Sequence, residues 1–445
     1  MRFTSSSPEA SVPRMHGESV TAAPVFPRMI NLGQRFAPLV PIDVESAIAP
    51  GLASLASGLR PGSRVGVAVG SRGIAGLKPL VSVVIDTLRR SGALPFILPA
   101  MGSHGGATAD GQLALLAEYG VTEAAMGVPF RAGMEVEVVG RTDDGHEVVC
   151  SVEALRADSV VLINRIKPHT DFRGELGSGL LKMLVVGLGK AVGAAAFHRA
   201  ASRWGYERVL RAAARLLRQR LPVLAGVAIV ENQRHETARI EVVPGREIEA
   251  REGGLCAEAA RLMPRLPFEE LDLLIVDRMG KNVSGTGMDP AVIGRMIHGY
   301  SLAEDQERRS PHVRRLFVRD LTPESHGNAI GIGMADFTTR RLVEAMDRRV
   351  TVTNSLTALS LQGAKIPIYF DSDREAMSAA IDTLALPDPT RARVVRIADT
   401  LSVERIAISE ALAAEAEARA DLELVGGLRN VEFDEAGNLL DAAAE

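Results

Sequence analysis

The sequence predicts an α/β protein with two α/β domains, each built on a largely parallel or mixed sheet, and an active-site cleft between them. Its 445 residues exceed the size at which one hydrophobic core usually stops growing. From about residue 62, short β-branched runs alternate with longer segments of helical periodicity. Pro264 and Pro267 then interrupt helix-like sequence just before a new buried run at 271–276. A domain boundary near 265 follows.

The first domain is predicted to consist of successive βα units. Its expected strands are 65–69, 96–98, 160–163, 183–186, 223–230 and 239–243. Its expected helices are 77–90, 110–119, 194–204 and 207–218. The turn sequence Asp143-Asp144-Gly145 separates two further segments, 135–139 and 147–152, which predicts a hairpin or a small extension of the sheet.

The second domain mixes strands and helices in the same way. Its expected strands are 271–276, 329–333, 366–369 and 394–397, and its expected helices are 339–347, 373–384 and 410–420. We therefore divide the chain into a disordered leader (1–28), a catalytic and cofactor-binding domain (29–265), a domain that closes the cleft (266–430) and a tail (431–445).

Composition narrows the class of partner. The chain carries 51 basic and 55 acidic residues, which gives no electrostatic footprint for a nucleic acid or an anionic membrane. A small molecule is the expected partner, and a homo-oligomer is left open. Cys150 and Cys256 are the two cysteines, which excludes a disulfide framework and a cysteine-based zinc knuckle, and fits a cytoplasmic protein. No apolar run is long enough for a spanning helix.

Two histidines follow predicted strands, at the sheet edge where ligands bind in open α/β folds. His104 lies in the glycine-rich segment 102–106, and Thr108 behind it is placed to cap the next helix. His169 lies in the polar segment 164–173, after the strand predicted at 160–163. Each histidine is either a functional group or a side chain satisfied within a tight loop, and the local sequence leaves both interpretations open.

Lys182 ends the segment Gly177-Ser178-Gly179-Leu180-Leu181-Lys182 and directly precedes the strand predicted at 183–186. Such a lysine is either a surface residue whose stem covers apolar neighbours or a desolvated, reactive amine. His198 follows in a predicted helix and gains meaning only if the loops converge on it. The segment Gly70-Ser71-Arg72-Gly73 offers backbone amides and a guanidinium to an anion, or is a plain turn.

Taken together, these segments resemble the lactate racemase family. The matching residues are His104 in GSHGGAT, His169 in KPHTDF, Lys182 in SGLLK and His198 in AAFHRA, in the family's order. The resemblance extends over roughly residues 30–425, and its specific motifs lie in the first domain.

The resemblance implies a nickel-pincer nucleotide, a pyridinium mononucleotide that binds nickel through sulfur, carbon and sulfur and is joined to Lys182 by a thioamide. His198 corresponds to the protein ligand of the square-planar nickel. His104 and His169 correspond to the acid and base of a 2-hydroxy acid racemase or epimerase that works by hydride transfer. The residues assigned beside the cofactor are Ser71, Arg72, Ser178 and Gly179, and the partners include cofactor-synthesis proteins.

The departures from the family concern the substrate. Gly70 stands where an acidic residue is expected two places before Arg72, and the family's substrate-binding tyrosine and glutamine are absent from 280–289. We therefore expect a larger or sugar-derived hydroxy acid rather than lactate. The candidates to hold its carboxylate are Arg72, Lys281, Asn282 and Arg295.

Two other classes of function remain open from the sequence. In the first, His104, His169 and His198 bind zinc together and activate water as in a hydrolase, which gives Lys182 no task. In the second, the same scaffold is a sugar-acid binding protein or a lyase without redox chemistry.

Overall fold

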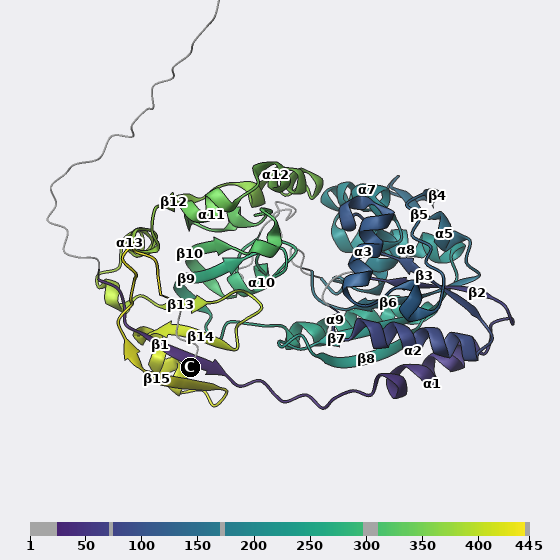
Figure 1. The fold of residues 1–445 in the computed structure, drawn as a ribbon, viewed down its shortest axis with the longest axis horizontal. Helices are drawn as coiled ribbons and strands as arrows, with labels where there is room; N and C mark the ends of the chain where they lie inside the picture. Colours follow the sequence, from purple (N-terminus) through teal and green to yellow (C-terminus); the bar gives the residue numbers. More distant parts are fainter. Residues whose placement is uncertain (1–24, 71–73, 170–173, 297–309, 441–445) are drawn as a thin grey trace, which may run out of the picture.

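A computed structural model describes residues 25–70, 74–169, 174–296 and 310–440 of the chain. It contains two main sheets, which Figure 1 shows in separate lobes joined by connecting segments. The first sheet has the order β3-β2-β6-β7-β8. Its strands are β2 (Arg64–Val69), β3 (Leu94–Pro99), β6 (Ser159–Arg165), β7 (Val223–Glu231) and β8 (Thr237–Pro244). All pairs are parallel except β7 with β8, as expected for βα units closed by an antiparallel edge strand.

Both faces of the first sheet are covered, because alternate residues of each strand point to opposite sides. In β2, Val65, Val67 and Val69 belong to one buried cluster and Ala68 to the other. The helices against the first face are α1 (Val44–Ala56), α2 (Leu77–Arg90), α3 (Ala109–Glu118) and α4 (Glu123–Met126). Those against the second are α6 (Leu180–Lys182), the π-helix η2 (Met183–Gly187), α7 (Lys190–Trp204), α8 (Tyr206–Arg220) and α9 (Ile248–Leu262).

A small hairpin flanks the first sheet. It consists of β4 (Val136–Arg141) and β5 (Glu147–Ser151), paired antiparallel and followed by α5 (Val152–Leu155). The hairpin predicted around Asp143-Asp144-Gly145 is thus confirmed. The cap predicted at Thr108 is confirmed as well, since its side chain accepts a hydrogen bond from the amide of Gly111 at the start of α3.

The second sheet has the order β12-β11-β10-β9-β13-β14-β1-β15. Its strands are β1 (Met29–Gln34), β9 (Glu270–Met279), β10 (His312–Leu321), β11 (Phe337–Thr339), β12 (Ile368–Phe370), β13 (Val394–Ile397), β14 (Arg405–Ser409) and β15 (Leu422–Arg429). The pairs from β12 to β13 are parallel, and those from β13 to β15 are antiparallel. The helices of this part are α10 (Pro290–Ile293), α11 (Arg340–Ala345), α12 (Arg348–Thr357), α13 (Asp373–Asp382) and α14 (Ala413–Glu417). The expected α/β class with largely parallel or mixed sheets is confirmed.

Two segments predicted as strands have other conformations. Residues 183–186 form a π-helix that continues α6. Their apolar side chains are buried within the core, and a short continuous apolar run does not distinguish a buried helix from a buried strand. Residues 329–333 are a turn leading into a 3₁₀-helix at Ile332–Met334.

Two terminal segments also differ from the prediction. Residues 29–34, assigned to the first domain without a predicted strand, form β1, which pairs with β14 and β15 of the second sheet. The part of the expected tail up to residue 440 is packed rather than free: Leu439 is buried, and Phe433 lies against Arg374 and Phe26. Residues 441–445 lie outside the described residues, as does the leader up to residue 24.

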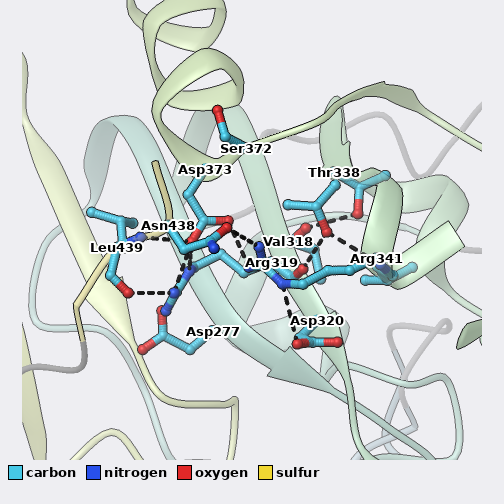
Figure 2. Close-up of polar contacts among 12 residues, drawn as sticks. Asp277, Val318, Arg319, Asp320, Thr338, Arg341, Ser372, Asp373, Asn438 and Leu439 are labelled. Carbon is cyan, nitrogen blue, oxygen red and sulfur yellow. Dashed lines mark hydrogen bonds and ion pairs between the residues drawn. The ribbon is translucent and has the colours of Figure 1, made fainter. Parts of the chain in front are cut away.

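A buried ionic network ties the C-terminal segment around Leu439 to the second sheet (Figure 2). Arg319 on β10 bonds to Asp277 and Asp373, each at 2.8 Å, and donates to the Leu439 carbonyl. The Leu439 amide in turn donates to Asp373 at 2.9 Å. Because the charges of Arg319, Asp277 and Asp373 and the Leu439 backbone groups are paired, satisfied buried polar contacts hold the segment around Leu439.

In the described part of the chain no single helix is long and apolar enough to cross a membrane; one bent pair, 180–187 with 190–204, meets these two criteria only when taken together.

Candidate functional site

Lys182 lies on the helical segment formed by α6 and η2, with its side chain half-buried. Its Nζ donates to Oγ of Ser178 at 3.1 Å and lies 5.8 Å from the centroid of the Tyr206 ring. Since Ser178 precedes Lys182 by one helical turn, the hydroxyl directs the amine along the helix toward the loop that carries Ser178. The amine is therefore held at a defined place rather than extended into solvent.

The backbone before Lys182 is tied to the loop that carries His169. The amides and carbonyls of Lys167 and Ser178 exchange hydrogen bonds at 2.8 and 2.9 Å. Glycine is required on this segment, because a Cβ at Gly177 would approach the Lys167 carbonyl to 2.1 Å, and one at Gly179 would approach Glu252 to 2.2 Å. The segment that carries His169 and the segment that leads to Lys182 are thus joined to each other by backbone hydrogen bonds.

Tyr206 lies at the centre of the site. Its ring centroid is 4.6 Å from that of His169 and 5.5 Å from that of Phe197. Its hydroxyl donates to the carbonyl of Gly177 at 2.8 Å. Burial and the nearby carboxyl of Glu252 raise the pKa of the phenol well above its usual value. Tyr206 is therefore a neutral, fixed platform between the histidine and Lys182.

His198 reaches the same region from α7. Its ring lies 5.8 Å from that of Phe197, edge to face. Burial, and to a smaller extent the charge of Lys182, lowers the pKa of His198 to about 4. The imidazole is consequently neutral at pH 7 and keeps a lone pair for a metal. The structure thus places His169 and Lys182 against the Tyr206 ring, and His198 close enough to Lys182 for its charge to act on the imidazole.

His104 lies in the loop between β3 and α3, with its side chain half-buried. This loop is fastened to the helical segment of Lys182, because the Gly102 amide donates to the Gly187 carbonyl at 3.1 Å. The close approach depends on glycine, since Gly102 has a positive φ and a Cβ there would lie 3.1 Å from the Val186 carbonyl. The His104 loop therefore contacts the segment that begins with Lys182.

A buried carboxyl group accepts a hydrogen bond from the backbone of the helix that carries Lys182. Glu252 on α9 is 1% exposed, and its Oε2 accepts a hydrogen bond from the Leu181 amide at 2.9 Å. Burial raises its pKa to about 7. Within the described residues its Oε1 has no hydrogen-bond partner. Burial also raises the pKa of nearby Cys256 to about 11, so this cysteine is an uncharged thiol at neutral pH.

A cavity of about 620 Å³ adjoins this cluster. Its lining includes His169, Glu175 and Cys256, small residues of α9, and Pro290 and Ala291 of α10. Residues before and after the predicted boundary near 265 thus line one cavity. Its volume lies in the range of small-molecule sites.

The three residues after the predicted boundary near 265 that could hold the substrate carboxylate are already engaged with other groups of the protein. Lys281 donates to the Gly285 carbonyl at 2.6 Å and to Asn354 at 3.0 Å, and Asn282 accepts a bond from Thr322 at 2.6 Å. Arg295 forms an ion pair with Asp336 at 2.7 Å, which engages its guanidinium away from the cavity lining. Ser71 and Arg72 lie outside the described residues.

No direct metal cluster is present in the described ranges: no three His, Cys, Asp or Glu side chains there are grouped to hold an ion. His104, His169 and His198 all belong to these ranges.

Comparison with known proteins gives a fold. No protein-family model matches the sequence, and no curated protein is close enough in sequence to count as a relative. Among solved structures, the lactate racemase apoprotein from Thermoanaerobacterium thermosaccharolyticum matches with a TM-score of 0.50 and 13% identity, over 84% of this chain and 99% of that one. The chain has the lactate racemase fold. A Thermotoga maritima protein matches at a TM-score of 0.45 and 16% identity, over 64% of this chain and 71% of that one.

The sequence resemblance to lactate racemase is thus confirmed at the level of the fold. Sequence reasoning missed Tyr206 and Glu252, which hold the motifs in place within that fold. Tyr206 gave a weak signal, as a single aromatic residue directly after Gly205 at the start of an amphipathic helix. Glu252 gave none, because an acidic residue on a helix usually faces solvent.

Proposed function

We propose that this protein is an isomerase, a racemase or epimerase that inverts the hydroxyl-bearing carbon of a 2-hydroxy acid with a nickel-pincer nucleotide bound to Lys182. The proposal rests on His169 and Lys182 lying against the Tyr206 ring, with His198 near enough to Lys182 for its charge to act on the imidazole. The lactate racemase fold supports it, because the match covers 84% of this chain.

The donor groups fit the cofactor. His198 is uncharged at neutral pH because of its burial, which is the state that a metal ligand requires. Lys182 offers a half-buried amine beside it for the covalent bond, directed by Ser178. Ser178 and Gly179, with Ser71 and Arg72, are the further contacts that we assign to the nucleotide. When bound, the nickel-pincer nucleotide supplies a hydride acceptor next to the substrate carbon.

The proton chemistry falls to His104 and His169. A neutral imidazole on one side takes the hydroxyl proton when the carbon gives up its hydride, and a protonated imidazole on the other side returns a proton to the keto oxygen. Histidine suits both tasks because its pKa lies near neutrality. Tyr206 keeps the His169 ring in place, so that the acid and base face the substrate with a fixed geometry.

The cavity supports a substrate larger than lactate. A volume of about 620 Å³ exceeds what a three-carbon acid fills, and His169 on its wall gives such a substrate access to a base. We assign the carboxylate to Arg72, Lys281 or Asn282, with Arg295 as the candidate that must first leave Asp336. We further propose that the protein is cytoplasmic and acts as a homo-oligomer or a monomer. Its cofactor is made and delivered by dedicated synthesis proteins.

The alternatives have less support. A hydrolase with zinc bound by three histidines requires a ligand group that the described residues do not form. A lyase or a sugar-acid binding protein on the same fold has no need of Lys182 near His198, yet the charge of Lys182 acts on the His198 imidazole.

One experiment separates these functions. The chain is co-expressed with the cofactor-synthesis proteins, and its intact mass, its nickel content and the mass of the peptide with Lys182 are measured. We expect a nucleotide adduct on Lys182, nickel near one per chain, and inversion of at least one acid in a chiral screen of 2-hydroxy and sugar acids. Active protein with an unmodified Lys182 would refute the proposal, and bound zinc with a hydrolytic activity would favour the hydrolase.

A further inference from the structure

Lys190 is an unusual side chain within the first lobe. It begins α7 and is 1% exposed, the largest side chain among the fully buried residues described. Lysine is rarely buried so completely, because removing an ammonium ion from water is costly. Burial accordingly lowers the pKa of Lys190 to about 8.

The Lys190 ammonium group is connected to the backbone of His104 by a chain of hydrogen bonds. Its Nζ donates to the Pro99 carbonyl at 2.7 Å and to Oε1 of Gln112 at 3.3 Å. Gln112 is itself 0% exposed. Its Nε2 donates to the Gly102 carbonyl at 2.9 Å and to the His104 carbonyl at 3.4 Å. A continuous chain of hydrogen bonds thus runs from Lys190 through Gln112 to the backbone of His104.

We propose that Lys190 and Gln112 are positioning residues for His104, with Lys190 fixing the orientation of the Gln112 amide and the amide fixing the His104 loop. The proposal rests on the function proposed above, in which His104 is an acid and base.

The orientation argument follows from the chemistry of the amide. A glutamine side chain presents an acceptor on one side and two donors on the other, and the two orientations have nearly the same shape. Because Lys190 has only donors, it selects the orientation with Oε1 toward itself. The NH₂ group must then face the two loop carbonyls. Without Lys190, the flipped amide would place an oxygen against those carbonyl oxygens.

The loop needs such a support. Gly102, Gly105 and Gly106 all have φ near +60°, and glycine has more conformational freedom to lose than any other residue. Besides the Gly102 amide, which bonds to the Gly187 carbonyl, the carbonyls of Gly102 and His104 hold the loop through the Gln112 amide. An imidazole that transfers protons has to be fixed within a fraction of an ångström to be effective.

The test uses Gln112→Glu and Lys190→Met. Gln112→Glu keeps the shape and the bond to Lys190 but replaces the donor with an oxygen that faces the loop carbonyls. Lys190→Met keeps a long apolar side chain and releases the amide. Lys78→Met, on an exposed part of α2, is the matched control. The full-length protein is used without cofactor, so the result does not depend on nickel or on a substrate.

Two measurements are made on each variant. Hydrogen exchange of the backbone amides of His104 and Ala107 should become about tenfold faster or more in both test variants and stay unchanged in Lys78→Met. The NMR titration of the His104 imidazole, assigned with His104→Ala, should change its apparent pKa or broaden in the test variants, while the exposed His326 keeps its titration. Variants that fold, with His104 titration and exchange as in the parent, would overturn the proposal.

A measurement on the unmodified chain covers the case in which neither variant folds. The side-chain NH₂ protons of Gln112 should exchange slowly, since both the donor and the acceptor side of the amide are engaged. Rapid exchange of these protons would equally overturn the proposal. If instead the cofactor never loads, the function proposed for His104 fails while the positioning of its loop is still decided by these data.

Discussion

The rings of His169 and Tyr206 pack with their centroids 4.6 Å apart and their planes at 49°. Tyr206 also bonds through its hydroxyl to Gly177, in the segment that leads to Lys182. One aromatic side chain therefore sets the position of the proposed base with respect to the proposed cofactor anchor. Tyr206 thus joins the start of α8 to the segment between β6 and α6.

Replacing Tyr206 separates the roles of its ring and its hydroxyl. Tyr206→Phe loses one buried hydrogen bond, which should cost about 1 kcal/mol of unfolding free energy. Tyr206→Leu also removes the platform, and we expect a loss of about 3 kcal/mol from the smaller, poorly fitting side chain. Urea unfolding measures both. Equal losses in the two variants would show that the ring contact with His169 contributes little.

Glu252 gives the fold a pH dependence whose sign can be worked out. Its pKa in the folded protein is about 7 against a usual value of 4.5, so the folded state binds more protons than the unfolded state between these two values. The stability that Glu252 contributes is present below pH 4.5 and is lost as the pH rises through 7. The slope is about 1.4 kcal/mol per pH unit at most.

Glu252→Gln should remove this dependence. The amide cannot ionise, and its oxygen can still accept from the Leu181 amide. Urea unfolding at pH 5 and pH 8 should show a smaller loss of stability with rising pH in the variant than in the parent. The same pH slope in both proteins would contradict the assignment. Glu153→Gln on α5 is a control at a more accessible carboxylate.

Much of the fold follows from the sequence where the apolar pattern is regular. Helix α2 (Leu77–Arg90) and strand β13 (Val394–Ile397) have the predicted limits. Strand β10 was missed because arginines interrupt its apolar residues, and these charges are acceptable only beside partners such as Asp272 and Asp277 on the neighbouring strand β9. A partner that is distant in sequence leaves no local pattern.

The candidate site also contains features that the local sequence predicts and features that depend on distant parts of the chain. His104, His169, Lys182 and His198 could be named from motifs, since glycine and histidine in loops after strands are a local signal. The helix of Lys182 could not, because a run of four apolar residues fits a strand equally well. Lys190 looks like a solvated helix residue in the sequence, and its burial depends on α3 and β3 packing over it.

His198 is predicted to affect the metal and not the covalent bond. Since Lys182 is the anchor, His198→Ala should keep the nucleotide adduct and lose most of the nickel, as the protein ligand is gone. Intact mass and metal analysis of the co-expressed protein measure the two quantities. His326→Ala, at an exposed histidine, is the control. Full nickel occupancy in His198→Ala would assign the ligand role to another residue.

His104 and His169 should each be needed in both directions of the reaction. If one removes the hydroxyl proton from one enantiomer and the other returns it for the opposite enantiomer, every net inversion uses both. His104→Ala and His169→Ala should therefore each lower the rate on the order of a hundredfold or more in both directions. Neither is assigned to the metal, so the adduct on Lys182 and the nickel should remain. The measurement is racemisation started from each pure enantiomer of the acid found in the screen, with nickel analysed in the same samples. Near-normal activity in one variant would remove that histidine from the mechanism, and loss of nickel in both would instead favour a site in which the histidines bind the metal.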